Sequence, residues 1–150
     1  LMDVYEDCGG SVLGVQEVPR EKVSSYGVVK PVPVKDHLWR AEDLVEKPSL
    51  AEAPSRLAVL GRYIITPEIF SILEKTEPGR GGEIQLTDAL KKLAEREPVF
   101  AYEFEGRRYD SGDKQGFLEA TVDFALKRPE LRDQFLRYLM KTVGRETGEQ

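Results

Sequence analysis

The segment LAVLGRYIITPEIF at residues 57–70 decides the fold class of this chain. Its first part, up to Thr66, is almost continuously apolar and short, which is typical of a buried central strand. Thr66, Pro67 and Glu68 then predict a helix start, with a capping hydroxyl, a proline at the first helical position and an acid in the first turn. A strand that runs directly into a helix predicts an α/β protein.

On the N-terminal side of this segment, a short helix precedes β-branched stretches. Residues 1–8 place apolar side chains at the helical spacing i, i+3, i+4 and i+7, and Gly9 and Gly10 predict the end of that helix. Because no capping residue precedes it, we expect the chain to be a fragment of a longer protein. The proline-containing residues 31–40 predict an edge hairpin or a surface excursion. Strands are predicted at residues 11–18, 25–29 and 44–45.

On the C-terminal side, helices dominate the pattern. After a glycine loop we predict a helix from Thr87 or Asp88, a strand at 99–105, and helices at 113–128 and 130–143. The polar residues 144–150 predict a loose tail. We therefore expect an α/β chain with a helical C-terminus.

Composition excludes several functional classes. The 150 residues include 22 Lys and Arg and 27 Asp and Glu, and the resulting net charge of -5 argues against a duplex nucleic-acid binder. The single cysteine, Cys8, excludes an internal disulfide framework, and the single histidine, His37, excludes a two-His metal site within the chain. There is no complete phosphate-binding loop, no secretory signal and no apolar run long enough for a bilayer span. These observations predict a soluble, cytoplasmic protein.

Three polar segments are candidates for a binding site. Residues 45–48 (VEKP) put a carboxylate and an ammonium at the end of a strand that we expect to be parallel to its neighbours, where open α/β sheets bind ligands. Residues 79–88 (GRGGEIQLTD) lead from a glycine loop into a helix, and residues 109–113 (YDSGD) place Asp110 before another helix. A surface ion pair, a loose loop before a helix cap, and an N-cap at Asp110 or Ser111 explain the three segments about as well.

Taken in order, these segments resemble the C-terminal half of bacterial UTP–glucose-1-phosphate uridylyltransferases. The matching stretches are VYEDCGGSVLGVQEVP, SSYGVV, LVEKP, APSRLAVLGRYIITPEIF, GRGGEIQLTDAL and YDSGDKQGFLEA. The resemblance implies the C-terminal part of a Rossmann-like nucleotide-diphospho-sugar transferase fold, a mixed sheet flanked by helices. It also implies that residues 1–143 form the sugar-phosphate-binding half of a nucleotidyltransferase domain whose nucleotide-binding half is absent.

The resemblance implies roles for individual residues. Gly27 matches a glycine whose backbone meets the glucose ring, and Glu46 matches an acid that accepts hydrogen bonds from glucose hydroxyls. Lys47 matches the lysine that contacts the sugar-linked phosphate, so it is the implied catalytic residue. Gln85 and Thr87 fall where related enzymes line the sugar pocket.

Asp110 matches a carboxylate that helps to hold Mg²⁺, and its partner acid is expected outside this chain. The implied ligands are glucose 1-phosphate, UTP and UDP-glucose, without nucleic acid or membrane, and the intact enzyme is expected to be a cytoplasmic homo-oligomer. The fragment alone is expected to be inactive. Two alternatives stay open: a glucose-1-phosphate thymidylyltransferase, which shares the EKP segment, and a non-catalytic paralogue or module that binds and modulates an intact enzyme.

Overall fold

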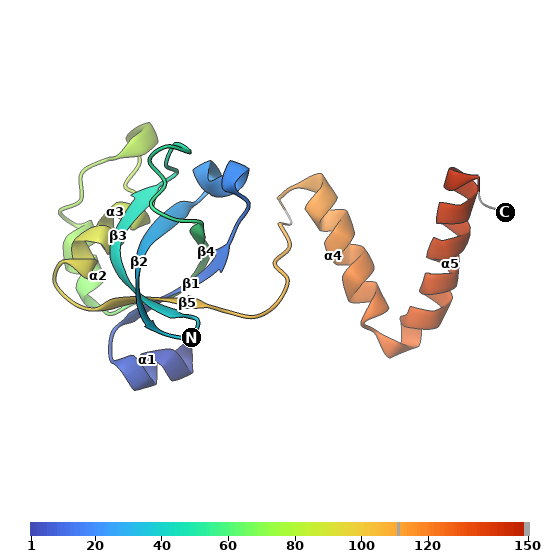
Figure 1. Ribbon diagram of the computed structural model, residues 1–150, viewed down its shortest axis with the longest axis horizontal. Coiled ribbons are helices and arrows are strands. Elements are labelled where there is room, and N and C mark those ends of the chain that lie inside the picture. The colour runs from blue at the N-terminus through green and yellow to red at the C-terminus, as the bar shows by residue number, and fades with distance from the viewer. Residues whose placement is uncertain (111, 149–150) are drawn as a thin grey trace. The chain divides into compact units, whose positions relative to one another are not determined.

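The computed structural model describes residues 1–110 and 112–148, without the side chain of Arg80. The chain divides into two compact units, Leu1–Glu105 and Gly106–Gln150. The first unit contains strands and short helices, and the described elements of the second unit are helices (Figure 1).

The elements of the first unit, in chain order, are α1 (Met2–Cys8), β1 (Ser11–Glu17), η1 (Arg20–Ser25), β2 (Gly27–Lys35), β3 (Leu38–Glu46), β4 (Leu57–Ile64), α2 (Glu68–Leu73), η2 (Arg80–Gly82), α3 (Leu86–Ala94) and β5 (Val99–Glu103). The second unit contains α4 (Lys114–Leu126) and α5 (Pro129–Thr147). The α/β class is confirmed by this mixture of helices and strands. The hairpin predicted within residues 31–40 is confirmed as well, because β2 and β3 pair antiparallel around that segment. The predicted N-terminal helix is confirmed as α1, which ends at Gly9 in the left-handed conformation (φ 67°) that glycine adopts readily.

The sheet is mixed, as expected, but its strands close into a barrel in the order β1-β4-β2-β3-β5. β1 pairs parallel with β5 and antiparallel with β4. The register of the β2–β3 hairpin shifts after Lys30 and again after Pro33, and such irregularities bend and twist a ribbon. The curved hairpin, visible in Figure 1, brings β3 to β5, where Leu38 pairs with Tyr102. The mixed sheet flanked by helices is thus found among the described elements, whereas its Rossmann-like arrangement stays a prediction.

The apolar segment from Leu57 to Thr66 is only partly a buried strand. β4 lies between β1 and β2, as a central strand does, and it is antiparallel to both. Its first residues, Leu57, Ala58 and Val59, are buried, whereas Arg62 and Tyr63 are exposed. The apolar run therefore supplies the core from one end and surface residues from the other.

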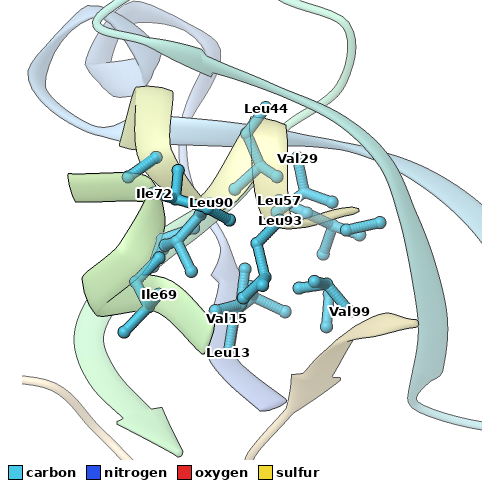
Figure 2. Packing of buried hydrophobic residues seen from close by; sticks show 14 residues of the cluster. Leu13, Val15, Val29, Leu44, Leu57, Ile69, Ile72, Leu90, Leu93 and Val99 are labelled. Atoms are coloured by element: carbon cyan, nitrogen blue, oxygen red, sulfur yellow. The ribbon is translucent and has the colours of Figure 1, made fainter. Parts of the chain in front are cut away.

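Two hydrophobic clusters lie on opposite faces of β1. Val12 belongs to the smaller cluster with Val4 of α1, while its neighbour Leu13 belongs to the larger one, as the period of two in a strand requires. Side chains of α2 and α3 point into the larger cluster from one side of the strands (Figure 2). Its labelled members are Leu13, Val15, Val29, Leu44, Leu57, Ile69, Ile72, Leu90, Leu93 and Val99. These contacts fix the start of α3 relative to the strands.

The start of α2 differs from its prediction. The helix begins at Glu68 without a side-chain cap. The hydroxyl of Thr66 donates to Glu97 Oε1 at 2.5 Å, and the backbone N–H of Thr66 donates to the fully buried Ser11 Oγ at 3.0 Å. Thr66 therefore joins the start of β1 to the loop before β5 and does not cap the helix.

In the second unit, Asp113 caps α4, because its carboxylate accepts the N–H of Gly116 at 2.9 Å. α5 continues to Thr147, so the first part of the segment 144–150, expected to be a loose tail, is helical. Residues 149 and 150 lie outside the described residues. None of the helices that the structure describes is long and apolar enough to cross a membrane.

Candidate functional site

The end of β3 brings together most of the predicted site residues. Gly27, the first residue of β2, pairs with Glu46, the last residue of β3. Thr87, in the first turn of α3, donates its hydroxyl to Glu46 Oε2 at 2.5 Å. Lys47 follows Glu46 directly, and its Nζ lies 3.8 Å from Glu46 Oε1. Three elements therefore contribute to the surroundings of one carboxylate.

The backbone at Lys47 explains why the lysine side chain is accessible. Its N–H still donates to the carbonyl of Tyr26 at 3.0 Å, but its φ of 44° turns the chain out of the strand before Pro48. A lysine in this left-handed region is uncommon. The side chain of Lys47 is 50% exposed, whereas that of Glu46 is 15% exposed. The carboxylate is thus sheltered and the ammonium can meet a ligand from solvent.

The position of this pair corrects one step of the prediction. β3 is antiparallel to both β2 and β5, so Glu46 does not lie at the carboxyl end of a parallel strand. The rule for ligand sites in open parallel sheets therefore does not apply here. Pairing with the start of β2 and packing of α3 on the barrel gather the residues instead.

Gly27 lies against both partners of the Thr87–Glu46 hydrogen bond. A Cβ atom at this buried position would lie 2.9 Å from Thr87 Oγ1 and 3.1 Å from Glu46 Oε2. The first distance is shorter than a carbon atom normally allows. Either the hydroxyl or the carboxylate would have to move if residue 27 had a side chain.

Gln85 precedes α3 and lies two residues before Thr87 in the chain. It is the N-cap residue of the helix, with an extended backbone (φ -90°, ψ 126°), and its side chain does not cap the helix. Its carbonyl accepts the N–H of Ala89 at 3.3 Å. A contact between the Gln85 side chain and a sugar stays a prediction.

Sequence reasoning missed Tyr63, which lies on the exposed part of β4. Tyr63 is 39% exposed, and its partial burial raises the pKa of the phenol above its ordinary value, while the negative charge of Glu46 raises this pKa further. Its signal in the sequence was weak: one aromatic residue with a polar end, next to Arg62, inside an otherwise apolar segment.

Asp110 belongs to the second unit. Its Oδ1 accepts the N–H of Gly112 at 3.1 Å, and its Oδ2 lies 3.3 Å from Arg108. Asp113 caps α4, so Asp110 is not the cap, and Ser111 lies outside the described residues. Among the described residues there is no group of three or more His, Cys, Asp or Glu placed to hold a metal ion. A single carboxylate fits Mg²⁺ as one ligand among waters, phosphate oxygens and a further acid.

The Glu46–Lys47 arrangement is suited to binding a phosphorylated polyol. A sheltered carboxylate accepts hydrogen bonds from hydroxyl groups, and a nearby ammonium neutralises a phosphate as a compact point charge. The described contacts of Glu46 and Lys47 are hydrogen bonds and charge contacts. The chemistry they support is therefore orientation and charge neutralisation.

Comparison with known proteins adds independent findings. The chain is 49% identical over 146 residues to a UTP–glucose-1-phosphate uridylyltransferase of Bacillus subtilis strain 168, covering 97% of this chain and 50% of that protein. It is 51% identical over 150 residues to the protein of the same name from Streptococcus pneumoniae serotype 4 strain TIGR4, covering 99% of this chain and 50% of that protein. The chain thus spans about half the length of the curated relatives it matches.

Solved structures and a family model agree with these relatives. The crystal structure of a UDP-glucose pyrophosphorylase complexed with UDP-glucose matches with a TM-score of 0.80 and 44% identity, over 84% of this chain and 48% of that one. The fold is therefore an α/β fold of the nucleotidyltransferase kind. The family model described as nucleotidyl transferase matches residues 6–126. Because this match covers most of the 150 residues of the chain, the chain belongs to the nucleotidyl transferase family.

Proposed function

We propose that the chain is the C-terminal, sugar-phosphate-binding half of a UTP–glucose-1-phosphate uridylyltransferase, with residues 1–143 forming that half. The enzyme joins UTP and glucose 1-phosphate to give UDP-glucose and pyrophosphate. One observation carries the proposal: in a chain about 50% identical to proteins of that name, Lys47 Nζ lies 3.8 Å from a carboxylate that Thr87 holds. An acid for hydroxyls beside a lysine for phosphate matches the two chemical parts of glucose 1-phosphate.

In this reaction a phosphate oxygen of glucose 1-phosphate forms a bond to the α-phosphorus of UTP, while the bond from that phosphorus to the leaving pyrophosphate breaks. Nucleotidyl transfer needs positioning and charge neutralisation more than covalent help. Glu46 orients the sugar through its hydroxyls, and Lys47 reduces the repulsion between the phosphate of glucose 1-phosphate and the triphosphate. Asp110 would supply one oxygen ligand to Mg²⁺, which neutralises phosphate charge when bound.

Binding of glucose 1-phosphate to the 150-residue chain tests the site directly. Isothermal titration calorimetry should detect binding of α-D-glucose 1-phosphate, and Lys47→Ala should raise the Kd by about tenfold or more, because a charge-assisted contact is lost. Lys92→Ala is the matched control, since Lys92 is an exposed lysine on α3. Equal affinities for Lys47→Ala and Lys92→Ala would remove Lys47 from the site.

Turnover requires the rest of the relative. We expect no UDP-glucose from the 150-residue chain alone, and we expect product when the chain is joined to the part of the Bacillus subtilis relative that has no counterpart here. Release of pyrophosphate and formation of UDP-glucose are measured with UTP and glucose 1-phosphate. Turnover by the chain alone would contradict the proposed division of the enzyme.

A further inference from the structure

We infer that Thr87 is a positioning residue that holds Glu46 for the sugar, and that Gly27 leaves the space this hydrogen bond needs. The inference rests on the proposed function and adds a role in holding Glu46 to the direct sugar contacts that the family resemblance implied for Thr87 and Gly27. We refer to Gly27, Glu46 and Thr87 as the carboxylate clamp.

The Thr87 hydroxyl donates its hydrogen bond to Glu46. A threonine hydroxyl has one proton to donate, and that of Thr87 is directed at Glu46 Oε2, 2.5 Å away. The same proton cannot be donated to a sugar hydroxyl. As a donor, Thr87 therefore acts on a ligand through the carboxylate of Glu46, while its oxygen can still accept a hydrogen bond from a sugar hydroxyl.

The hydrogen bond from Thr87 restricts the side-chain conformation of Glu46 before a ligand binds. A glutamate side chain loses considerable rotamer entropy when it is ordered, and a group ordered before binding does not lose that entropy on binding. With Oε2 held by Thr87, Oε1 is the oxygen that lies on the side of Lys47, 3.8 Å from Nζ. The clamp thus presents one carboxylate oxygen next to the ammonium that faces the phosphate.

The space around residue 27 is limited by the other two residues of the clamp. A Cβ there would lie 2.9 Å from Thr87 Oγ1, 3.1 Å from Glu46 Oε2 and 3.4 Å from Thr87 Cγ2. All three atoms belong to the clamp, and Gly27 has a negative φ, since it is not among the residues with positive φ in the described chain. Space, and not backbone conformation, is therefore the reason for a glycine at this position.

The inference is tested by titrating α-D-glucose 1-phosphate into variants of the 150-residue chain. Thr87→Val keeps the shape and removes the donor, so we expect the Kd to rise about tenfold, and we expect Thr87→Ser to restore it to within about twofold. Thr121→Val is the control, because Thr121 is exposed on α4 and its hydroxyl donates to the carbonyl of Phe117. Unchanged affinity of Thr87→Val, or failure of Thr87→Ser to restore it, would overturn the positioning role.

A double-mutant cycle separates the two roles of Gly27. Gly27→Ala should weaken binding about tenfold when Thr87 is present, and by about twofold or less in the Thr87→Ala background, where both Thr87 atoms near the new Cβ are gone and Glu46 is free to move away from it. If the backbone of Gly27 met the sugar and the new Cβ blocked it, the loss would be the same in both backgrounds. Equal losses would therefore overturn the space-keeping role.

A ligand-free measurement distinguishes this inference from the proposed function. Thermal melts of Thr87→Val, Glu46→Ala and the double variant should be non-additive, because each single change removes the same hydrogen bond. Additive shifts in Tm would overturn the clamp, whatever the binding data show. If the Tm shifts of the variants are non-additive and the wild-type chain does not bind glucose 1-phosphate, the clamp is supported as a structural unit and the proposed function is contradicted.

Discussion

Lys47, the lysine that we propose to contact the phosphate, has a backbone conformation that is unfavourable for an L-residue. At φ 44° an L-residue is less stable by roughly 1–2 kcal/mol, whereas glycine adopts this region readily. We expect Lys47→Gly to unfold with a free energy about 0.5–1 kcal/mol higher than Lys47→Ala, after allowance for the greater freedom of glycine in the unfolded chain. Both variants should lose affinity for glucose 1-phosphate. Urea unfolding and calorimetry measure the two effects, and a lower stability of the glycine variant would contradict the strain.

Tyr63 predicts a pH dependence that includes Glu46. Its pKa is raised above 10.0, first by burial and then by the charge of Glu46, so the unfolded chain loses this proton before the folded chain does. The stabilising contribution is therefore complete below the unfolded pKa of about 10 and is lost as pH rises through the folded pKa. We expect Glu46→Gln to lower the pKa of Tyr63 only part of the way, because burial remains. An NMR titration of the Tyr63 ring, with Tyr63→Phe for assignment, measures this pKa, and an unchanged value would separate the phenol from the site.

At the level of elements, the contacts of Thr66 join three segments of the barrel unit. We expect Thr66→Val to lower the free energy of unfolding by about 1–3 kcal/mol, because the partly buried carboxylate of Glu97 loses the donor at 2.5 Å and keeps the more distant Ser11 hydroxyl at 3.3 Å. Thr121→Val, on the exposed face of α4, should change stability by less than about 0.5 kcal/mol. Urea denaturation of both variants compares the two threonines. Similar effects would show that Thr66 stabilises no more than a surface residue.

Two acids precede α4: Asp113 caps the helix, and Asp110 is the residue that we propose as a Mg²⁺ ligand. Asp113 is the cap, so we expect Asp113→Ala to destabilise the helix by about 1 kcal/mol and Asp110→Asn to leave the melting temperature nearly unchanged. In the enzyme assembled with the remaining part of the relative, Asp110→Asn should raise the Mg²⁺ concentration needed for half-maximal turnover, because a hard cation loses a charged oxygen. A Mg²⁺ titration of activity beside a thermal melt tests both, and an unshifted titration would exclude Asp110 as a ligand.

On the scale of the whole molecule, both hydrophobic clusters and the carboxylate clamp belong to the first unit. α4 and α5, by contrast, contain no buried residue among those the structure describes. We therefore expect residues 1–105 to fold and to bind glucose 1-phosphate with a Kd within about twofold of the 150-residue chain, since no described contact of Glu46 or Thr87 lies beyond Glu105. Thermal melting and calorimetry of the shortened chain measure this. An unfolded or non-binding product would show that the second unit is required.

The helices, the hairpin and the family could be predicted from the sequence because their signals are local. Helical spacing in residues 1–8 and the EKP segment at Glu46 and Lys47 each depend on neighbouring residues only. Local patterns also misled: Thr66 has the side chain of a cap, yet its hydroxyl finds a better acceptor in Glu97. The apolar run at 57–64 does not reveal where β4 leaves the core.

The sequence by itself determined the α/β class of the fold, the hairpin and most of the α-helices, and it singled out the acid and the lysine that we propose for the site. Only the tertiary structure decided that the strands close into a barrel and that Thr87 holds Glu46, 41 positions away in the chain. The physical reason is that closure, hydrogen bonds between elements and excluded space at Gly27 depend on residues far apart in sequence, which a periodic pattern does not relate to one another.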